Sequence, residues 1–346
     1  MSRIPVAILG ATGAVGQKFI SLLDGHPMFE VKELVASPRS AGNAYRDAVH
    51  WKQPRNMPAG IADMTVKSLQ ESLDSRLLFS GLDSSVAGEA ETRFAQLGHV
   101  VVSNSRNHRM DADVPLVIPE INADHLALLS RQVGPGRIVT NSNCSTMFLT
   151  MALAPLHRAF GVSRVHVVTM QAISGAGYPG VPAADILGNV VPYISGEEDK
   201  LETEPQKILG TLNGDHVKPA DMVISAQCNR VPVFDGHLEN LSVELVRKAG
   251  LDEVRAALRE YEVPEKIRKL PSAPESMIVL RDEDDRPQPG LDLMANEGMS
   301  CVIGRLRSCP VWDLRMAILG HNTIRGAAGA AILNAEYLHT QGLLER

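Results

Sequence analysis

The residues with the clearest capacity for chemistry surround one cysteine, Cys144. It stands in residues 141–146 (NSNCST), which follow an expected strand and open a long apolar stretch, 147–160. The start of a helix stabilises a thiolate through its dipole and lowers the pKa of the thiol, so a cysteine there is a candidate nucleophile. The position therefore predicts an acyl-enzyme intermediate on Cys144. The alternative is a cysteine that only packs beneath the helix start.

A nucleophilic thiolate needs a partner that handles protons, and His237 has the most informative context of the eleven histidines. It ends the segment CNRVPVFDGH, in which Arg230 stands seven residues earlier, across a glycine turn. A strand with an arginine at one end and a histidine after the turn can present both side chains to one pocket. Imidazole changes its charge near neutral pH, which suits acid–base work. The alternative is a structural turn.

A second site is indicated near the N-terminus, where residues 10–16 read GATGAVG between an apolar strand and a helix. Glycines at Gly10, Gly13 and Gly16 permit a tight turn and close approach of the backbone, while the helix start offers N–H groups to a pyrophosphate. Because the turn follows the first strand of an alternating strand–helix pattern, it predicts dinucleotide binding rather than a plain turn.

The end of the second expected strand, residues 31–36, indicates which dinucleotide is bound. NAD sites usually place a carboxylate roughly 20 residues after the glycines. Here the strand runs into Ser37, Pro38, Arg39 and Ser40, with no carboxylate at its end. A planar guanidinium suits a ribose 2′-phosphate. The sequence therefore predicts NADP rather than NAD, with an ordinary surface arginine as the alternative.

Two kinds of architecture are expected to position these residues. Up to residue 140, short apolar strands alternate with helical stretches, which is typical of a doubly wound parallel sheet that binds ligands at the carboxyl ends of its strands. From about residue 164, strand-like runs lack regular helical crossovers, and the tail 322–338 returns to a Gly/Ala-rich helical pattern. We predict an α/β Rossmann-type domain, residues 1–142 plus 321–346, and an α+β catalytic domain, 143–320.

Composition excludes several classes of protein. The 346 residues are 44% hydrophobic and 21% charged, which is ordinary for a folded chain and excludes a disordered one. A net charge of −6 gives no basic field for nucleic acid or an anionic membrane. No apolar run reaches the roughly 18 residues of a membrane span, and no secretory signal is recognisable, so a cytoplasmic protein is expected. The four cysteines lack C-x-x-C spacing, and no metal site is predicted.

Together, these motifs resemble the aspartate-semialdehyde dehydrogenases, specifically their archaeal/fungal-type branch. The resemblance spans nearly the whole chain in ordered segments: GATGAVG, SPRSAG with AVHWKQ, FSGLDSSVAG, VVSNSRNHRM with DVPLVIPEIN, SNCST, TMQAISGAGYPG, YISGEEDKLETE before KILG, RVPVFDGH and GHNTIRGAAGA. It implies an oxidoreductase that reversibly reduces L-aspartyl 4-phosphate to L-aspartate 4-semialdehyde with NADPH and releases phosphate, in the biosynthesis of lysine, threonine and methionine. By this resemblance, Cys144 displaces phosphate to form a thioester, and hydride transfer gives a thiohemiacetal that releases the aldehyde.

The resemblance also implies roles for other residues. His237 matches the acid–base histidine and Gln171 the glutamine that orients the substrate. Arg230 matches the arginine that binds the substrate α-carboxylate, and Glu197 matches the glutamate that faces its α-amino group. Lys200 and Arg109 match the cations that hold phosphate, although residues 197–200 alone would be read as a solvated helix end. The Cys144 N–H is suited to stabilise an oxyanion, with Asn143 as a weaker candidate. The predicted cofactor contacts are Gly10, Thr12, Gly13, Ala14, Val15, Ser37, Arg39, Ser40, Ser80, Ser174, Gly175 and Asn322.

Alternatives to this assignment stay open. Pro38 stands where the family often has serine, and because proline lacks an N–H donor and fixes φ, dual use of NAD and NADP is one of them. An acyl-CoA reductase such as malonyl-CoA reductase resembles the same branch, but it needs no amino-group partner at Glu197. A non-catalytic NADP-binding protein with an oxidisable Cys144 is a third, disfavoured by the intact set of Cys144, Gln171 and His237. The resemblance further implies a homodimer or homotetramer, built through the second domain.

Overall fold

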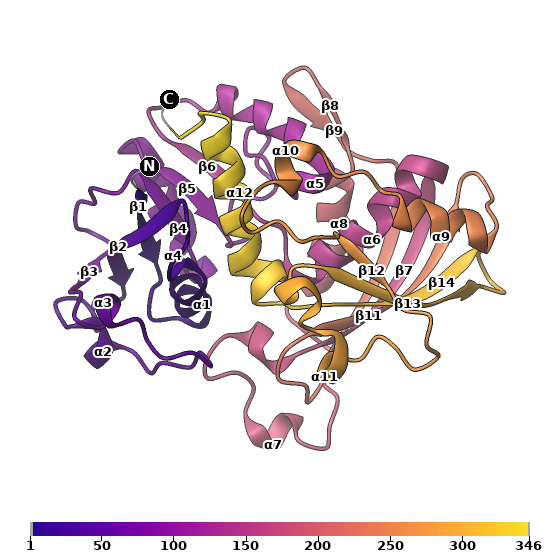
Figure 1. Cartoon of the computed structure of the whole chain (residues 1–346), viewed down its shortest axis with the longest axis horizontal. Helices are drawn as coiled ribbons and strands as arrows, with labels where there is room; N and C mark the ends of the chain where they lie inside the picture. Colours follow the sequence, from indigo (N-terminus) through magenta and orange to yellow (C-terminus); the bar gives the residue numbers. More distant parts are fainter. Residues whose placement is uncertain (1–2, 345–346) are drawn as a thin grey trace.

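Two six-stranded sheets placed side by side form the frame of the molecule (Figure 1). The structure, a computed structural model, describes residues 3–344. One sheet is built before residue 141 and the other after residue 161, and a long helix begins between them. The predicted α/β sheet domain with a second α+β part is therefore confirmed.

The first sheet has the strand order β3-β2-β1-β4-β5-β6, and each neighbouring pair is parallel. Residues 100–102, three valines, are buried on both faces, as expected where helices cover both sides of a parallel sheet. Its strands are β1 (Ile4–Leu9), β2 (Phe29–Ala36), β3 (Val66–Ser68), β4 (Leu77–Ser80), β5 (Val100–Ser103) and β6 (Arg137–Thr140). Its helices are α1 (Ala14–Leu23), α2 (Tyr45–Ala48), α3 (Ala59–Ala62), α4 (Ser84–Gln96), α5 (Pro119–Asn122) and a 3₁₀ helix (Ala123–Arg131).

The second sheet is mixed, with the order β10-β7-β11-β14-β13-β12. The β7–β11, β11–β14 and β13–β14 pairs are antiparallel, and the two outer pairs are parallel. Burial alternates along β7 and β11, so that one face packs into a core with helix α6 (Cys144–Phe160). The strands are β7 (Val162–Gln171), β10 (Val223–Arg230), β11 (His237–Leu245), β12 (Ile278–Leu280), β13 (Cys301–Ser308) and β14 (Leu314–Gly320), with a separate hairpin of β8 (Thr211–Asn213) and β9 (His216–Lys218).

Two helices of this second part contribute Leu201, Ile208, Val254 and Leu258 to the core that packs against its sheet. A loop with α7 projects from the body of the molecule (Figure 1). The helices are α7 (Ala183–Ile186), α8 (Glu197–Ile208), α9 (Leu251–Arg259), α10 (Glu265–Arg268), α11 (Pro289–Asp292) and two 3₁₀ helices (Ile173–Ala176 and Ala295–Gly298).

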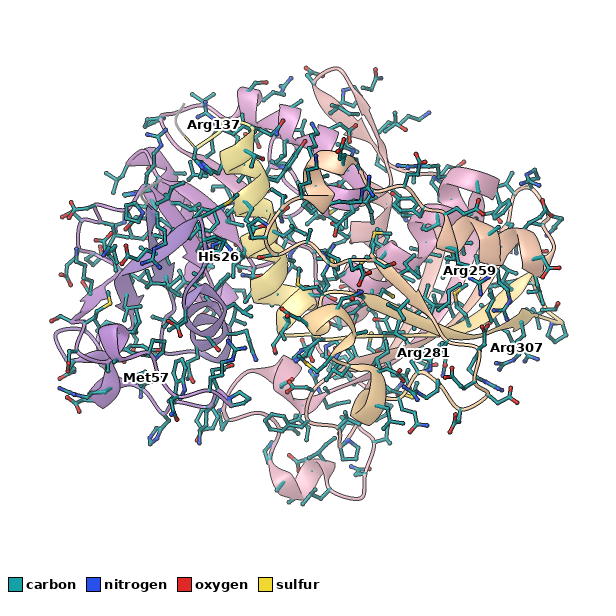
Figure 2. The ribbon with its side chains drawn as sticks, viewed as in Figure 1. His26, Met57, Arg137, Arg259, Arg281 and Arg307 are labelled. Carbon is teal, nitrogen blue, oxygen red and sulfur yellow. The ribbon has the colours of Figure 1, made fainter. Side chains whose placement is uncertain are left out.

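The C-terminal segment returns to the first sheet. After β14 it passes through a π-helical turn (Ile324–Ala328) into α12 (Gly329–Thr340), the yellow helix between the two sheets in Figure 1. Residues of α12 share a hydrophobic core with β1, β4 and β5. His26, labelled beside this helix in Figure 2, contacts Glu336 of α12 through Nε2 at 2.8 Å. The tail thus packs where the sequence-based division expects it, while the domain boundaries themselves stay a prediction.

Residues 3–344 lack two further features. No helix there is long and apolar enough to cross a membrane. Nor does this part of the chain bring together three His, Cys, Asp or Glu side chains that could hold a metal ion. The four cysteines carry free thiols.

Candidate active site

A cleft of about 700 Å³ runs along the carboxyl ends of the first sheet and reaches the start of α6. One wall comes from the glycine turn and the ends of β2 and β4, and the other from residues 174–178 and 322–327. The predicted residues that line it are Gly10, Thr12, Gly13, Ala14, Val15, Ser37, Arg109, Cys144, Ser174, Gly175, Lys200 and Asn322.

The glycine turn has the geometry that a pyrophosphate requires. Gly10 has φ +77°, and a Cβ there would lie 2.7 Å from the Gly81 carbonyl oxygen. A Cβ at Gly16 would lie 2.2 Å from the Gly10 carbonyl oxygen. Helix α1 then begins with no side-chain cap and no acidic residue in its first turn. Its N-terminal N–H groups and positive dipole end therefore face the cleft without a competing anion.

The end of β2 only partly follows the sequence prediction. Ser37 and Pro38 line the cleft, whereas Arg39 is exposed and Ser40 is half-buried, and neither belongs to the lining. The carboxylate of Asp83 does line this region, but it accepts hydrogen bonds from the Ser85 N–H (2.9 Å) and hydroxyl (2.6 Å).

Ser80, a predicted cofactor contact, does not line the cleft. It is fully buried at the end of β4, and its hydroxyl donates to Oε1 of Glu91 at 2.6 Å. Ser103, the last residue of β5, donates to the same oxygen at 2.7 Å. The lining at this edge comes instead from the following residues, Gly81 and Asn104.

Cys144 and His237 form a close pair. Cys144 is the first residue of α6, and Asn143 caps the helix by accepting hydrogen bonds from the N–H groups of Ser145 and Thr146. The Cys144 Sγ lies 3.2 Å from His237 Nε2. His237 Nδ1 accepts the Ala172 N–H at 3.1 Å, which in the neutral ring places the hydrogen on Nε2, facing the sulfur.

Burial controls the charge of this pair in the free protein. Burial, followed by the nearby Glu197, raises the pKa of the Cys144 thiol to about 12, although Lys200, Arg109 and Arg230 oppose it. Burial lowers the pKa of His237 to about 3. The pair therefore rests as a thiol and a neutral imidazole at neutral pH. Loss of hydration thus reverses the lowering of the thiol pKa that the helix start alone predicts.

Strand register in the second sheet brings three predicted residues to one level. Arg230 of β10 pairs with Gln171 of β7, and the Leu238–Met170 pair between β11 and β7 puts His237 one step further along. All three side chains are buried. Arg230 and His237 lie behind Gly175, where a Cβ would be 2.9 Å from Arg230 Nη1 and 3.1 Å from His237 Cε1. Glycine at this position thus leaves room between the cleft and the buried arginine and histidine.

Arg230, Gln171 and Asn322, three of the predicted residues near this level, have the following hydrogen-bond partners. Arg230 Nη1 donates to the Ala172 carbonyl at 2.7 Å. Gln171 Nε2 is 3.4 Å from Thr169 Oγ1 and does not line the cleft. Asn322 accepts the Gly236 N–H at 2.9 Å and donates to Ser174 Oγ at 2.8 Å. Asn322 therefore connects the turn before His237 to the cofactor side of the cleft.

The start of α8 is part of the site and not a solvated helix end. The buried Glu197 accepts from Asn143 Nδ2 at 2.7 Å and from Lys200 Nζ at 2.8 Å. Burial acts to raise its pKa, but Lys200 and the Asn143 hydrogen bond together lower that pKa below its ordinary value. Glu197 is therefore a carboxylate at neutral pH, as the partner of an ammonium group must be.

Arg109 lies at the other end of the predicted substrate region. Its guanidinium donates to Glu204 Oε1 at 2.8 Å and to the Asn104 carbonyl at 2.7 Å. Sequence reasoning missed Glu204, as it missed Ala172 and Gly326, where a Cβ would lie 2.8 Å from Cys144 Cβ. Glu204 lies at helical spacing from Glu197 and Lys200, and this spacing was the signal that could have revealed it.

Sequence reasoning also missed Glu239, two residues beyond His237 on the buried face of β11. Its neighbours across the strands are Thr169 and Ile318, and its side chain is fully buried. Within residues 3–344, neither carboxyl oxygen makes a hydrogen bond of full geometry, although the Ser145 hydroxyl is near enough to act against the rise in its pKa. Burial raises the pKa of Glu239 well above its ordinary value, which favours the protonated form of this carboxyl in the native protein.

We expect Glu239→Gln to change how stability depends on pH. The native pKa of Glu239 lies above the unfolded one, so its protonated form stabilises the native state fully only below the unfolded pKa, and that contribution is lost as pH rises. Between the unfolded and the native pKa of Glu239, the free energy of unfolding of the parent falls relative to the variant by about 1.4 kcal/mol per pH unit. Urea unfolding at intervals from pH 5 to pH 8 measures the difference. Parallel curves for the two proteins would show an ionised Glu239.

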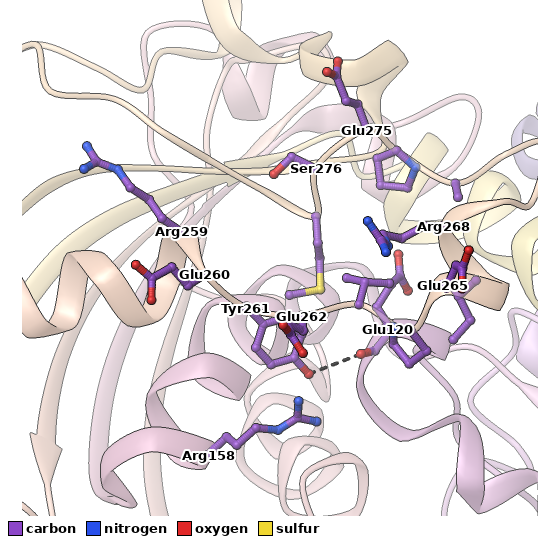
Figure 3. Close-up of a pocket in the computed structure, with 16 residues that line it drawn as sticks. Glu120, Arg158, Arg259, Glu260, Tyr261, Glu262, Glu265, Arg268, Glu275 and Ser276 are labelled. Carbon is purple, nitrogen blue, oxygen red and sulfur yellow. Dashed lines mark hydrogen bonds between the residues drawn. The ribbon is translucent and has the colours of Figure 1, made fainter.

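A second cavity, of about 580 Å³, lies away from these residues (Figure 3). Tyr261 closes one side by donating from its hydroxyl to the Glu120 carbonyl at 3.2 Å. The Glu120 carboxylate forms a buried two-point pair with Arg325. None of the predicted site residues lines this cavity, so we place the chemistry in the cleft beside Cys144.

Comparison with known proteins finds relatives that match nearly the whole chain. Residues 5–129 match the family described as "Semialdehyde dehydrogenase, NAD binding domain", and residues 153–325 match "Semialdehyde dehydrogenase, dimerisation domain". Similar curated proteins are named aspartate-semialdehyde dehydrogenase. That of Methanothermobacter thermautotrophicus is 48% identical, covering 97% of this chain and 99% of its own. That of Schizosaccharomyces pombe is 47% identical, covering 98% and 99%.

Solved structures show the same similarity. Aspartate semialdehyde dehydrogenase with NADP from Candida albicans superposes with a TM-score of 0.91 at 43% identity, covering 99% of this chain and 100% of the other. Aspartate semialdehyde dehydrogenase II complexed with ASA from Vibrio cholerae has a TM-score of 0.79 at 25% identity, covering 98% and 99%.

Proposed function

The chain belongs to the aspartate-semialdehyde dehydrogenase family, and from this premise we propose that it reduces L-aspartyl 4-phosphate to L-aspartate 4-semialdehyde with NADPH, reversibly, and releases phosphate. The observation that carries the proposal is the contact of 3.2 Å between Cys144 Sγ and His237 Nε2, beside a cleft that begins at the glycine turn. The reaction is a step in the biosynthesis of lysine, threonine and methionine.

We propose that the chain's own residues form and break the bond to sulfur. The Cys144 sulfur attacks the acyl carbon, and the bond from that carbon to the phosphate oxygen breaks, with its electron pair leaving on phosphate. The thiol proton leaves with phosphate, because His237 already carries hydrogen on the nitrogen that faces sulfur. Arg109 and Lys200 stabilise the departing anion.

The second half of the reaction reduces the thioester. The nicotinamide supplies hydride to the thioester carbon when the cofactor is bound. The backbone N–H of Cys144, at the start of α6, stabilises the oxyanion that results. When the carbon–sulfur bond then breaks, the electron pair returns to sulfur. His237 passes its Nε2 proton to that sulfur and regains one from solvent, which restores the thiol.

The remaining charges fit an amino acid. We propose that Arg230 binds the α-carboxylate with the part of its guanidinium not used by the Ala172 carbonyl, and that Glu197 faces the α-amino group. Gln171 orients the acyl group from the level of Arg230 and His237. An acyl-CoA substrate such as malonyl-CoA brings no α-ammonium group for Glu197 to face, so this buried carboxylate supports the aspartyl substrate.

The reverse reaction tests the proposed function. L-aspartate 4-semialdehyde, inorganic phosphate and NADP should together produce NADPH, measured by its absorbance, with no product when phosphate is omitted. Malonyl-CoA with NADPH is the parallel assay. Turnover of malonyl-CoA with none of the semialdehyde would replace the proposal by an acyl-CoA reductase.

Arg39→Ala should weaken NADP more than NAD. A guanidinium that pairs with the 2′-phosphate contributes a charge-assisted hydrogen bond, so we expect the KM for NADP to rise about tenfold or more while that for NAD stays within twofold. Arg46→Ala is the matched control, because Arg46 lies on α2 and pairs with Asp63. Equal weakening of the two cofactors would refute the role of Arg39.

The proposal also covers the assembly of the protein and its location in the cell. The description of the family that matches residues 153–325 supports a homodimer, and a homotetramer and a cytoplasmic location remain predictions. The division into 1–142 plus 321–346 and 143–320 is likewise proposed, supported by the packing of α12 in a core with β1, β4 and β5.

A further inference from the structure

Helix α8 presents four charged side chains to the first sheet's loops and the start of α6. Their spacing of three or four residues places Glu197, Lys200, Glu204 and Lys207 on one face of the helix. Glu197 and Lys200 belong to the site already described. Lys207 Nζ donates to the carbonyls of Arg109, Asp111 and Val114 at 2.7–2.8 Å, which holds the loop that carries Arg109.

Glu204 connects two parts of the site, the guanidinium of Arg109 and the backbone directly before Cys144. Oε1 accepts from Arg109 Nη1 at 2.8 Å, and Oε2 accepts from the Asn143 N–H at 2.7 Å. The side chain is 2% exposed, so both hydrogen bonds are shielded from water. Asn143 is the N-cap of α6 and directly precedes Cys144. One carboxylate therefore spans the distance between the guanidinium and the start of the nucleophile helix.

The guanidinium of Arg109 has five N–H groups, and its hydrogen bonds to Glu204 and Asn104 use two of them. Nη1 is used by Glu204 and Nη2 by the Asn104 carbonyl. Nε is buried and has no hydrogen-bond partner within residues 3–344, and Arg109 lines the cleft. A guanidinium has five N–H groups in one plane, so holding one edge determines where the others point.

We propose that Glu204 is a positioning residue, which holds the guanidinium of Arg109 at a set separation from Cys144 so that phosphate and the acyl carbon are aligned. The inference rests on the proposed function, since it takes Arg109 as a phosphate ligand. Two acceptor oxygens are required, because one receives the guanidinium and the other the backbone N–H. A neutral amide has one acceptor and one donor at these places, and a shorter carboxylate does not reach both partners.

Glu204→Gln and Glu204→Asp test this positioning in the reverse reaction. We expect the KM for phosphate to rise about tenfold or more in each variant, while the KM values for semialdehyde and NADP stay within twofold. Glu202→Gln is the matched control: Glu202 lies on the same helix and accepts the Ala226 N–H at 2.9 Å, outside the cleft. Its three KM values should match those of the parent.

The outcomes separate this inference from the proposed function. If the parent turns over, a uniform change in all three KM values, no change in any, or full recovery in Glu204→Asp would overturn the positioning role. If the parent does not turn over, the proposed function fails, and the shift in Tm caused by inorganic phosphate decides the inference. A phosphate shift present in the parent and lost in Glu204→Gln supports Glu204. An equal shift in both, or none in the parent, overturns it.

Discussion

Cys144→Ala is expected to reduce NADPH formation from semialdehyde and phosphate by about 10⁴-fold or more. The reason is that the variant has no atom 3.2 Å from His237 Nε2 that could form the thioester, so neither half of the reaction has its covalent intermediate. NADP binding should stay unchanged, because Cys144 lies at the start of α6 and is not among the predicted cofactor contacts. NADPH absorbance measures turnover, and calorimetric titration measures NADP binding.

A second cysteine serves as the control for this result. Cys309 has a free, partly exposed thiol outside the residues that line the cleft, so Cys309→Ala should keep full activity. Full turnover by Cys144→Ala would refute the covalent mechanism. Joint loss of turnover and NADP binding would instead indicate a damaged fold.

His237→Asn and His237→Gln should each lower kcat by about 10²- to 10⁴-fold. Glutamine can place an amide N–H near the sulfur where Nε2 lies, and asparagine can keep an acceptor for the Ala172 N–H where Nδ1 lies. Neither amide exchanges a proton in the physiological range. The pair thus separates the two hydrogen bonds of the ring, at 3.2 Å and 3.1 Å, from its acid–base chemistry.

Steady-state kinetics of the reverse reaction with both variants would distinguish these roles. Comparable losses in both variants indicate that proton exchange by the imidazole limits the reaction. Activity near that of the parent in His237→Gln alone would mean that His237 only donates a hydrogen bond to sulfur. Near-normal activity in His237→Asn would contradict any role of Nε2.

Features that depend on residues close together in the sequence were predictable from the sequence. The glycine turn requires Gly10 at φ +77° and no Cβ at Gly16, and such a requirement is visible within seven residues. The start of α6 at Cys144 and the alternation of strands and helices are local in the same sense. The fold class followed from these patterns, because periodicity and turn chemistry act over a few residues.

Contacts between distant residues were decided by packing. Cys144 and His237 are 93 residues apart, and the register of β7, β10 and β11 brings His237 to the level of Arg230 and Gln171. A shift of one residue in that register would turn these side chains to the opposite face. Before any resemblance is considered, no single segment of the sequence carries this information.

Burial was the other quantity that only the tertiary structure supplied. The helix start predicts a lowered thiol pKa at Cys144, whereas loss of hydration raises it to about 12. Residues 197–200 read as a solvated helix end, yet Glu197 is buried against Asn143 and Lys200. Residue type and spacing determined which groups could react. The charge of each group depends on how much water the assembled fold removes and on which side chains it places nearby. Both depend on many segments together.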